Sequence, residues 1–147
     1  MTRRKDHVVS SSAPESVGAY PHARVANGFV FLSGVGPRVR GTTEIPGVVL
    51  GENGEMVSYS IEDQCRSCFA NVRAVLEDAG SHWNNIVDVL VFLTDMNRDF
   101  EAFNRLYREY FAGDGQPNPT RTTIEINKLP QGGSAPIAIE LKVIATI

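Results

Sequence analysis

Cysteine, histidine and tryptophan are scarce in this sequence, and long apolar runs are missing from it. The 147 residues include two cysteines, three histidines and one tryptophan. No apolar stretch approaches the roughly 18 residues that a membrane-spanning helix requires, and the polar N-terminus lacks the hydrophobic core of a secretory signal. We therefore expect a cytoplasmic protein with no membrane partner.

A concentration of positive charge is also missing. The formal net charge is -3, and apart from Arg3-Arg4-Lys5 the basic residues are scattered along the chain. Phosphate contacts dominate the affinity of proteins for nucleic acid and need a concentrated basic face. Nucleic acid is therefore not expected as the main partner.

The two cysteines, Cys65 and Cys68, form a C-x-x-C pair. There is no second cysteine pair, and the three histidines show no ligand spacing, so a zinc site would lack partners. Cys65 and Cys68 also share the inward side of an expected helix. We interpret them as buried thiols that act as small apolar side chains, with a metal or redox role as the alternative. No metal and no cofactor is predicted.

The length fits one domain, with a core large enough to need no disulfide. Residues 1–16 are polar and rich in serine, which predicts a flexible N-terminal segment, and residues 17–147 form the single domain. Asn27-Gly28 between strand-forming residues predicts a hairpin of Ala23–Ala26 with Phe29–Ser33. The glycine- and proline-rich segment Arg38–Tyr59 is expected to be mostly loop, with an alternative second turn at Glu52–Glu55.

Two amphipathic helices are expected. Ser60 with Asp63 resembles a capping box, and the apolar face that follows it continues to Gly80. Asn97 or Asp99 is expected to cap the second helix. The inward positions of the second helix are Phe100, Phe103, Tyr107, Tyr110 and Phe111.

Apolar segments outside the helices predict three further strands, over residues 86–94, 122–127 and 137–147. The element order predicts an α+β fold in which both helices lie on one face of a mixed sheet. Residues of the last strand alternate between the two faces of the sheet, and on each face they are at least partly apolar. The second face of the sheet is therefore expected to pack against copies of the chain in a symmetric oligomer.

Candidate chemistry lies in the last two strands. Pro119 cannot donate to a strand ladder, so the strand begins after it and Arg121 lies among its first residues. A guanidinium there is a two-pronged ligand for a carboxylate. With Glu140 nearby to orient or deprotonate a water molecule, the pair indicates hydrolytic chemistry on a small organic acid. The alternatives are that Arg121 pairs with Glu125 or Glu140 in a structural ion pair, and that Glu140 is simply buried and paired.

Five blocks of this sequence resemble the Rid family of reactive-intermediate deaminases, also called the YjgF type. The likeness runs from Gly18 to Ile147, and the blocks are Gly18–Ala23, Phe31–Pro37, Phe103–Tyr107, Pro119–Thr123 and Ile139–Ala145. The resemblance implies a chorismate-mutase-like α+β fold, assembled as a homotrimer with clefts between subunits; a dimer of trimers is a further alternative. It also implies cofactor-free hydrolysis of an enamine or imine carboxylate to a keto acid and ammonia.

The resemblance also implies roles for individual residues. Arg121 corresponds to the arginine that grips the substrate carboxylate, and Glu140 to the residue that positions the attacking water. The implied substrate-binding residues are Tyr20, Gly34, Asn104, Arg121 and Thr123. The sequence departs from the usual family pattern at Thr122-Thr123, where many members carry Ser-Cys, at Lys142, and in the longer segments 38–47 and 131–136.

Within the family, the sequence is most similar to the 2-aminomuconate deaminases of bacterial aromatic degradation. That substrate is a dicarboxylate, so a second cation is expected near the site, and the candidates are His22, Arg24, Arg38 and Arg40. Two alternatives remain: a general 2-aminoacrylate or 2-iminopropanoate deaminase, and a non-catalytic ligand-binding or chaperone-like trimer. RNA cleavage, reported for some relatives, is disfavoured by the acidic charge balance.

Overall fold

The computed structural model describes residues 6–147 of the chain, and a six-stranded mixed sheet forms its centre. The strand order is β1-β2-β3-β8-β6-β7, and only β6 and β7 run parallel. The six strands are β1 (His7–Val8), β2 (Ala23–Ala26), β3 (Phe29–Leu32), β6 (Ile86–Leu93), β7 (Thr120–Glu125) and β8 (Ile139–Thr146).

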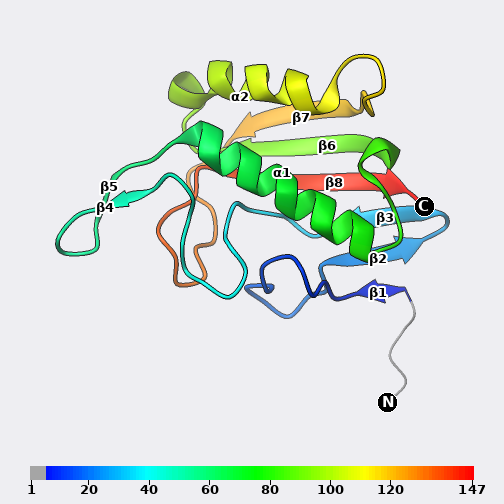
Figure 1. Cartoon of the computed structure of the whole chain (residues 1–147), viewed down its shortest axis with the longest axis horizontal. Helices are drawn as coiled ribbons and strands as arrows, with labels where there is room; N and C mark the ends of the chain where they lie inside the picture. Colours follow the sequence, from blue (N-terminus) through cyan, green and yellow to red (C-terminus); the bar gives the residue numbers. More distant parts are fainter. Residues whose placement is uncertain (1–5) are drawn as a thin grey trace.

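Two helices, α1 (Ile61–Asp78) and α2 (Met96–Phe111), cover one face of this sheet (Figure 1). The short 3-10 helix η1 (Trp83–Asn85) leads from α1 into β6. The predicted α+β fold with both helices on one face of a mixed sheet is confirmed. None of the helices within residues 6–147 is long and apolar enough to cross a membrane.

Local signals account for the boundaries of several elements. Asn27 and Gly28 have φ values of 50° and 78°, the left-handed conformation that a tight turn between β2 and β3 requires. The Ser60 side chain accepts a hydrogen bond from the Asp63 amide at 3.2 Å and caps α1, as predicted. β7 begins at Thr120, directly after Pro119 and two residues before the predicted start at residue 122.

The core lies between the helices and the sheet. β8 alternates strictly, and the residues of its inward set are fully buried: Ile139, Leu141, Val143 and Ala145. Cys65 and Cys68 face them from α1 and are buried and unpaired, as predicted. Burial raises the pKa of the Cys65 thiol to about 12, so this thiol stays protonated and acts as an apolar side chain.

The opposite face of the sheet has no helix over it. Phe29 and Phe31 of β3 are 41% and 40% exposed there, and Ile124 of β7 is 38% exposed. Glu140 and Lys142 of β8 belong to this face, because they alternate with its buried residues. We call it the open face.

The cap of α2 differs from the prediction. Its N-cap is Asp95, whose side chain accepts from the Arg98 amide at 3.0 Å, so the expectation of Asn97 or Asp99 was wrong. Asp99 instead turns into the core, where it is 1% exposed and accepts a hydrogen bond from the Tyr59 hydroxyl at 2.7 Å. Leu106, which was not predicted, is also buried in the α2 face, whereas Phe100 is 37% exposed.

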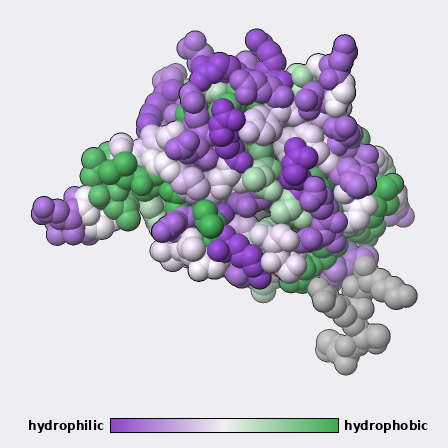
Figure 2. Space-filling view, in the orientation of Figure 1, coloured by the Kyte–Doolittle hydropathy of each residue, from purple (hydrophilic) through white to green (hydrophobic). Residues whose placement is uncertain are grey.

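The segment before α1 contains more structure than expected. The predicted turn at Glu52–Glu55 is the tip of a hairpin of β4 (Val49–Leu50) and β5 (Met56–Ser58). The hairpin extends away from the domain, and its apolar residues form an exposed patch at the left of the space-filling view (Figure 2).

The N-terminal residues pack more closely than expected. β1 pairs with β2, and Ser10 and Ala13 are only 2% and 1% exposed. This packing differs from the flexible segment predicted over residues 1–16, of which residues 1–5 lie outside the described part. The cause is a set of polar contacts that hold residues 10–15, the N-terminal strap, against the domain.

Candidate functional site

Arg121 lies in a cup of aromatic side chains from α2. β7 runs parallel to β6 with Arg121 opposite Val89 and Thr123 opposite Val91, so both residues point to the helix-covered face. The guanidinium donates a hydrogen bond to Asn104 Oδ1 at 2.8 Å. Its carbon lies 5.9, 5.4 and 4.5 Å from the ring centres of Phe100, Phe103 and Tyr107. The aromatic rings favour a cation and hold it in place.

Several polar groups around Arg121 have no partner. The Tyr107 hydroxyl and Thr123 Oγ1 are buried without a hydrogen bond, a costly arrangement that a bound molecule would relieve. Burial raises the pKa of Tyr107, and the charge on Arg121 opposes that rise.

Within residues 6–147 the structure gives Arg121 no carboxylate partner, and Glu125 accepts instead from the Met96 amide at 2.9 Å. The alternative of a structural ion pair for Arg121 is therefore wrong for this protomer.

Glu140 lies on the open face, beside Gly34. An added Cβ at Gly34 would lie only 2.6 Å from Glu140 Oε2, so the carboxylate occupies space that only glycine leaves free. Burial raises the pKa of Glu140, and the Arg38 guanidinium opposes the rise. Within the described residues Glu140 has neither a hydrogen bond nor an ion pair. It is therefore a carboxylate with a raised pKa and unused acceptor oxygens.

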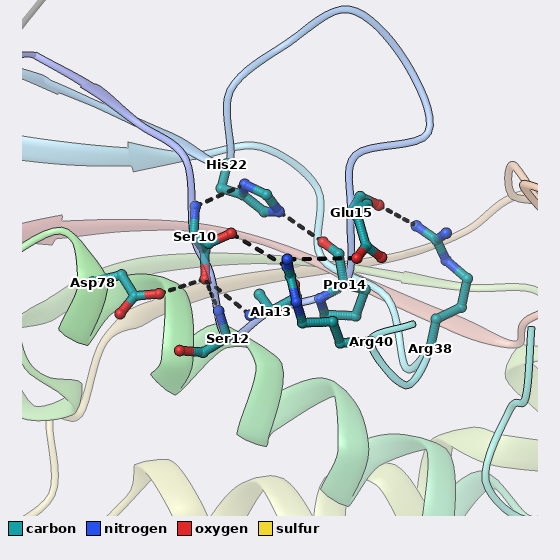
Figure 3. Close-up of polar contacts among 9 residues, drawn as sticks. All are labelled: Ser10, Ser12, Ala13, Pro14, Glu15, His22, Arg38, Arg40 and Asp78. Carbon is teal, nitrogen blue, oxygen red and sulfur yellow. Dashed lines mark hydrogen bonds and ion pairs between the residues drawn. The ribbon is translucent and has the colours of Figure 1, made fainter. Parts of the chain in front are cut away.

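A pocket lies beside Gly34, the residue that neighbours this carboxylate. Tyr20, Ser33, Gly34 and Arg38 line it together with the N-terminal strap. His22 holds the strap through both ring nitrogens: Nδ1 accepts from the Ser10 amide at 3.0 Å, and Nε2 lies 2.7 Å from the Pro14 carbonyl oxygen (Figure 3). Ser10 Oγ donates to Asp78 on α1 at 2.5 Å. The strap is therefore a fixed wall of the pocket.

The four candidate cations have different roles. His22 uses both ring nitrogens on the strap, and Arg24 forms an ion pair with Asp6 at 3.2 Å. Arg40 donates to the Ala13 carbonyl at 2.6 Å and pairs with Glu15 at 3.5 Å. Arg38 reaches the strap only through a 3.4 Å hydrogen bond to the Glu15 carbonyl (Figure 3). Of the four side chains, Arg38 therefore has the weakest polar contact and forms no ion pair within the described residues.

The predicted site residues fall into two groups on opposite faces of the sheet. Arg121, Asn104 and Thr123 lie on the helix-covered face near the β7 edge. Tyr20, Gly34 and Glu140 lie around the end of β3 and on the open face of β8. β6 separates β7 from β8 in the sheet. One protomer therefore does not bring Arg121 and Glu140 together, and each group is half of the expected site.

The contribution of the α2 aromatic rings was not predicted from the sequence as a feature of the site. The sequence signal that could have shown it is Asn104, because a buried amide within the row of aromatic residues on α2 needs a polar partner. In residues 6–147 no group of three or more histidine, cysteine, aspartate or glutamate side chains is arranged to hold a metal ion.

Comparison with known proteins identifies relatives along nearly the whole chain. The family model described as Endoribonuclease L-PSP matches residues 10–147. A RutC family protein of Pyrococcus horikoshii is 35% identical over 141 residues, which cover 96% of this chain and 97% of that protein. A protein of Dermatophagoides farinae named 2-iminobutanoate/2-iminopropanoate deaminase is 32% identical over 126 residues, 85% of this chain and 86% of its own length.

A solved structure has the same fold. Escherichia coli TdcF, crystallised with bound serine, superposes with a TM-score of 0.79 at 29% identity and covers 97% of this chain and 99% of its own. Together with the sequence matches, this likeness confirms the resemblance seen in the five sequence blocks. The chain belongs to the Rid family, which is also known by the names RutC, YjgF and endoribonuclease L-PSP.

Proposed function

We propose that this protein hydrolyses an enamine or imine carboxylic acid to the corresponding keto acid and ammonia. The observation that carries the proposal is Arg121, a guanidinium without a carboxylate partner in the described chain, held beside two buried hydroxyls that lack hydrogen bonds. This arrangement fits the carboxylate of a small acid. A relative is named as a deaminase of imine acids, which supports the reaction type.

The site residues can carry out this reaction in the following steps. Arg121 binds the substrate carboxylate and fixes the position of the neighbouring imine carbon. Water adds to that carbon as Glu140 accepts one of its protons, and a C–O bond forms. The C=N π bond opens as the C–O bond forms, and Glu140 returns the proton to the nitrogen. The hydroxyl group of this carbinolamine then gives its proton to the nitrogen, the C–N bond breaks, and ammonia leaves behind a carbonyl group. An enamine substrate first tautomerises to the imine. A carboxylate whose pKa is raised by burial can accept a proton and return it within one cycle.

We propose that the site is completed between subunits of a homotrimer. Arg121 of one subunit would then face Glu140 of the partner subunit across a cleft. Two observations support this arrangement: the two groups lie on opposite faces of one chain, and the open face exposes phenylalanine and isoleucine side chains. An exposed apolar face of this kind is typical of an interface.

The substrate that we propose within this class is 2-aminomuconate, a dicarboxylic enamine. Its second carboxylate requires a second cation, and Arg38 has the charge to meet it. A short enamine such as 2-aminoacrylate has only one carboxylate and would leave Arg38 without a role in binding.

Ammonia release from enamines generated in the assay tests the function. Arg121→Ala removes two charge-assisted hydrogen bonds, each worth roughly 1.5 to 3 kcal/mol, so kcat/KM should fall by about two to four powers of ten. Arg73→Ala is the matched control, because Arg73 lies on α1 over the Trp83 ring and belongs to neither group of site residues, and it should keep the parent rate.

Glu140→Gln separates the deaminase from a non-catalytic ligand-binding protein. In a deaminase, ammonia release collapses while carboxylate binding survives, because the amide keeps the shape but cannot take a proton. A parent protein that binds these acids but releases no ammonia, or an Arg121→Ala variant with the parent rate, would refute the proposal.

A further inference from the structure

Arg38 is held at the pocket by contacts that leave its charge available. Its backbone carbonyl accepts a hydrogen bond from Asn71 of α1 at 2.8 Å. Its Nη2 donates to the Glu15 carbonyl at 3.4 Å, and its Nη1 lies 3.2 Å from where a Cβ at Gly132 would be. These contacts bring segments 10–15 and 131–136 to the same guanidinium. Arg38 is therefore positioned, although none of these contacts neutralises it.

The acidic groups around Arg38 do not form a close pair with it. Glu15 makes its ion pair with Arg40, at 3.5 Å, and its side chain is 62% exposed. Glu140 is near enough to Arg38 for the guanidinium to affect its protonation, but no ion pair within 4.0 Å joins the two groups. Arg38 itself lines the pocket beside Gly34, so its guanidinium is open to a ligand group there.

The two unpaired guanidinium groups of the completed site, rather than its summed charge, favour a ligand with two anionic groups. Arg121 and Arg38 contribute two guanidinium groups without a close carboxylate, and Glu140 contributes one acid. One substrate carboxylate matches Arg121 and leaves Arg38 unmatched. A second carboxylate, remote from the reacting carbon, would meet Arg38 with the same two-pronged geometry.

We propose that Arg38 is the specificity-determining residue of this site and selects dicarboxylic over monocarboxylic substrates. This inference rests on the proposed deaminase function. It also assigns a role to segment 131–136, which packs against Arg38 at Gly132.

The test compares 2-aminomuconate with 2-aminoacrylate for the parent and for Arg38→Met. The ratio of the two kcat/KM values, dicarboxylate over monocarboxylate, should fall about 10- to 100-fold in Arg38→Met. Arg38→Lys keeps a charge and should recover part of the ratio. Arg73→Met removes a charge from α1, where Arg73 lies over the Trp83 ring and outside both groups of site residues, and should leave the ratio at the parent value.

Equal losses on both substrates would overturn the proposal, because they would mean that Arg38 acts through Glu140 rather than on the ligand. Calorimetric binding of the inert acids adipate and hexanoate gives a readout without turnover. The parent should bind adipate more tightly, and Arg38→Met should lose that preference. If the parent releases no ammonia but prefers adipate through Arg38, the deaminase proposal fails and the dicarboxylate site stands. If the parent binds both acids equally, the dicarboxylate site is wrong.

Discussion

Gly34 and Glu140 compete for one small volume at the end of β3. A Cβ on residue 34 would lie 2.6 Å from Oε2 and 2.7 Å from Cδ of Glu140. The backbone at Gly34 is not in the left-handed region, so an alanine is conformationally tolerated there. Glycine is therefore required at this position by the space that the carboxylate needs, and this links a strand-end residue to the proposed water-activating group.

Gly34→Ala should damage catalysis more than stability. The added methyl meets the end of a flexible side chain, which can rotate away, so the free energy of unfolding should change by less than about 1 kcal/mol. The displaced carboxylate should lower kcat by ~100-fold, since a shift of about 1 Å at a catalytic group has that effect. Ammonia release and thermal unfolding measure the two quantities.

Gly36→Ala is the comparison for this prediction. Its methyl would meet Cδ1 of Ile137 at 3.0 Å and does not touch Glu140. A loss of turnover as large as that of Gly34→Ala would show that any bulk in this segment harms the site, and the specific role of Gly34 would be wrong.

At the scale of elements, the start of α2 depends on a competition among three acidic or amide residues. Asp95, Asn97 and Asp99 are all residue types that cap helices. Asp99 is drawn into the core by the Tyr59 hydroxyl, which fixes the helix register and leaves Asp95 at the N-cap. This start places Phe100, Phe103, Asn104 and Tyr107 over β7, where they contact Arg121.

Asp95→Ala should therefore destabilise the protein, with a cost of about 1 kcal/mol for the lost cap. Asn97→Ala is the matched control, because Asn97 is also a capping residue type but lies inside the helix, two residues after the N-cap. Its effect on the free energy of unfolding should stay within about 0.5 kcal/mol. Urea unfolding of the two variants measures the difference. Equal destabilisation would contradict the assigned cap.

At the scale of the whole molecule, the sheet separates the two groups of residues that form the proposed site. Arg121 with Asn104 belongs to the helix-covered face, and Glu140 with Gly34 belongs to the open face. A site that needs both groups must be formed by two chains, and a closed ring of identical subunits supplies the same pairing at every interface. Oligomerisation would then be part of catalysis rather than an addition to stability.

Mixing two inactive variants tests this arrangement. When Arg121→Ala and Glu140→Gln chains are unfolded, combined and refolded together, about a quarter of random interfaces receive both intact groups, and ammonia release should return to that fraction. The matched control combines Arg121→Ala with Asn104→Leu. Both changes affect the same half of the cleft, so no interface is restored. Activity that does not return in the first mixture would refute a site shared between subunits.

The sequence by itself determined the features that depend on a few neighbouring residues. The Asn27-Gly28 turn, the Ser60 cap, the start of β7 after Pro119 and the burial of both cysteines follow from local conformation and helical periodicity. Arg121, Asn104 and Glu140 were also identified from the sequence blocks as candidates. These signals act over short distances in the chain, and long-range packing does not change them.

Only the tertiary structure decided how these residues are arranged. The insertion of β6 between β7 and β8, the opposite faces of Arg121 and Glu140, and the different partners of the four candidate cations depend on contacts between segments far apart in the sequence. Side-chain periodicity tells which residues of one strand share a face, but it does not fix the order of strands or the face of another strand. That order is set by the packing of the whole core, and it separates the two halves of the site.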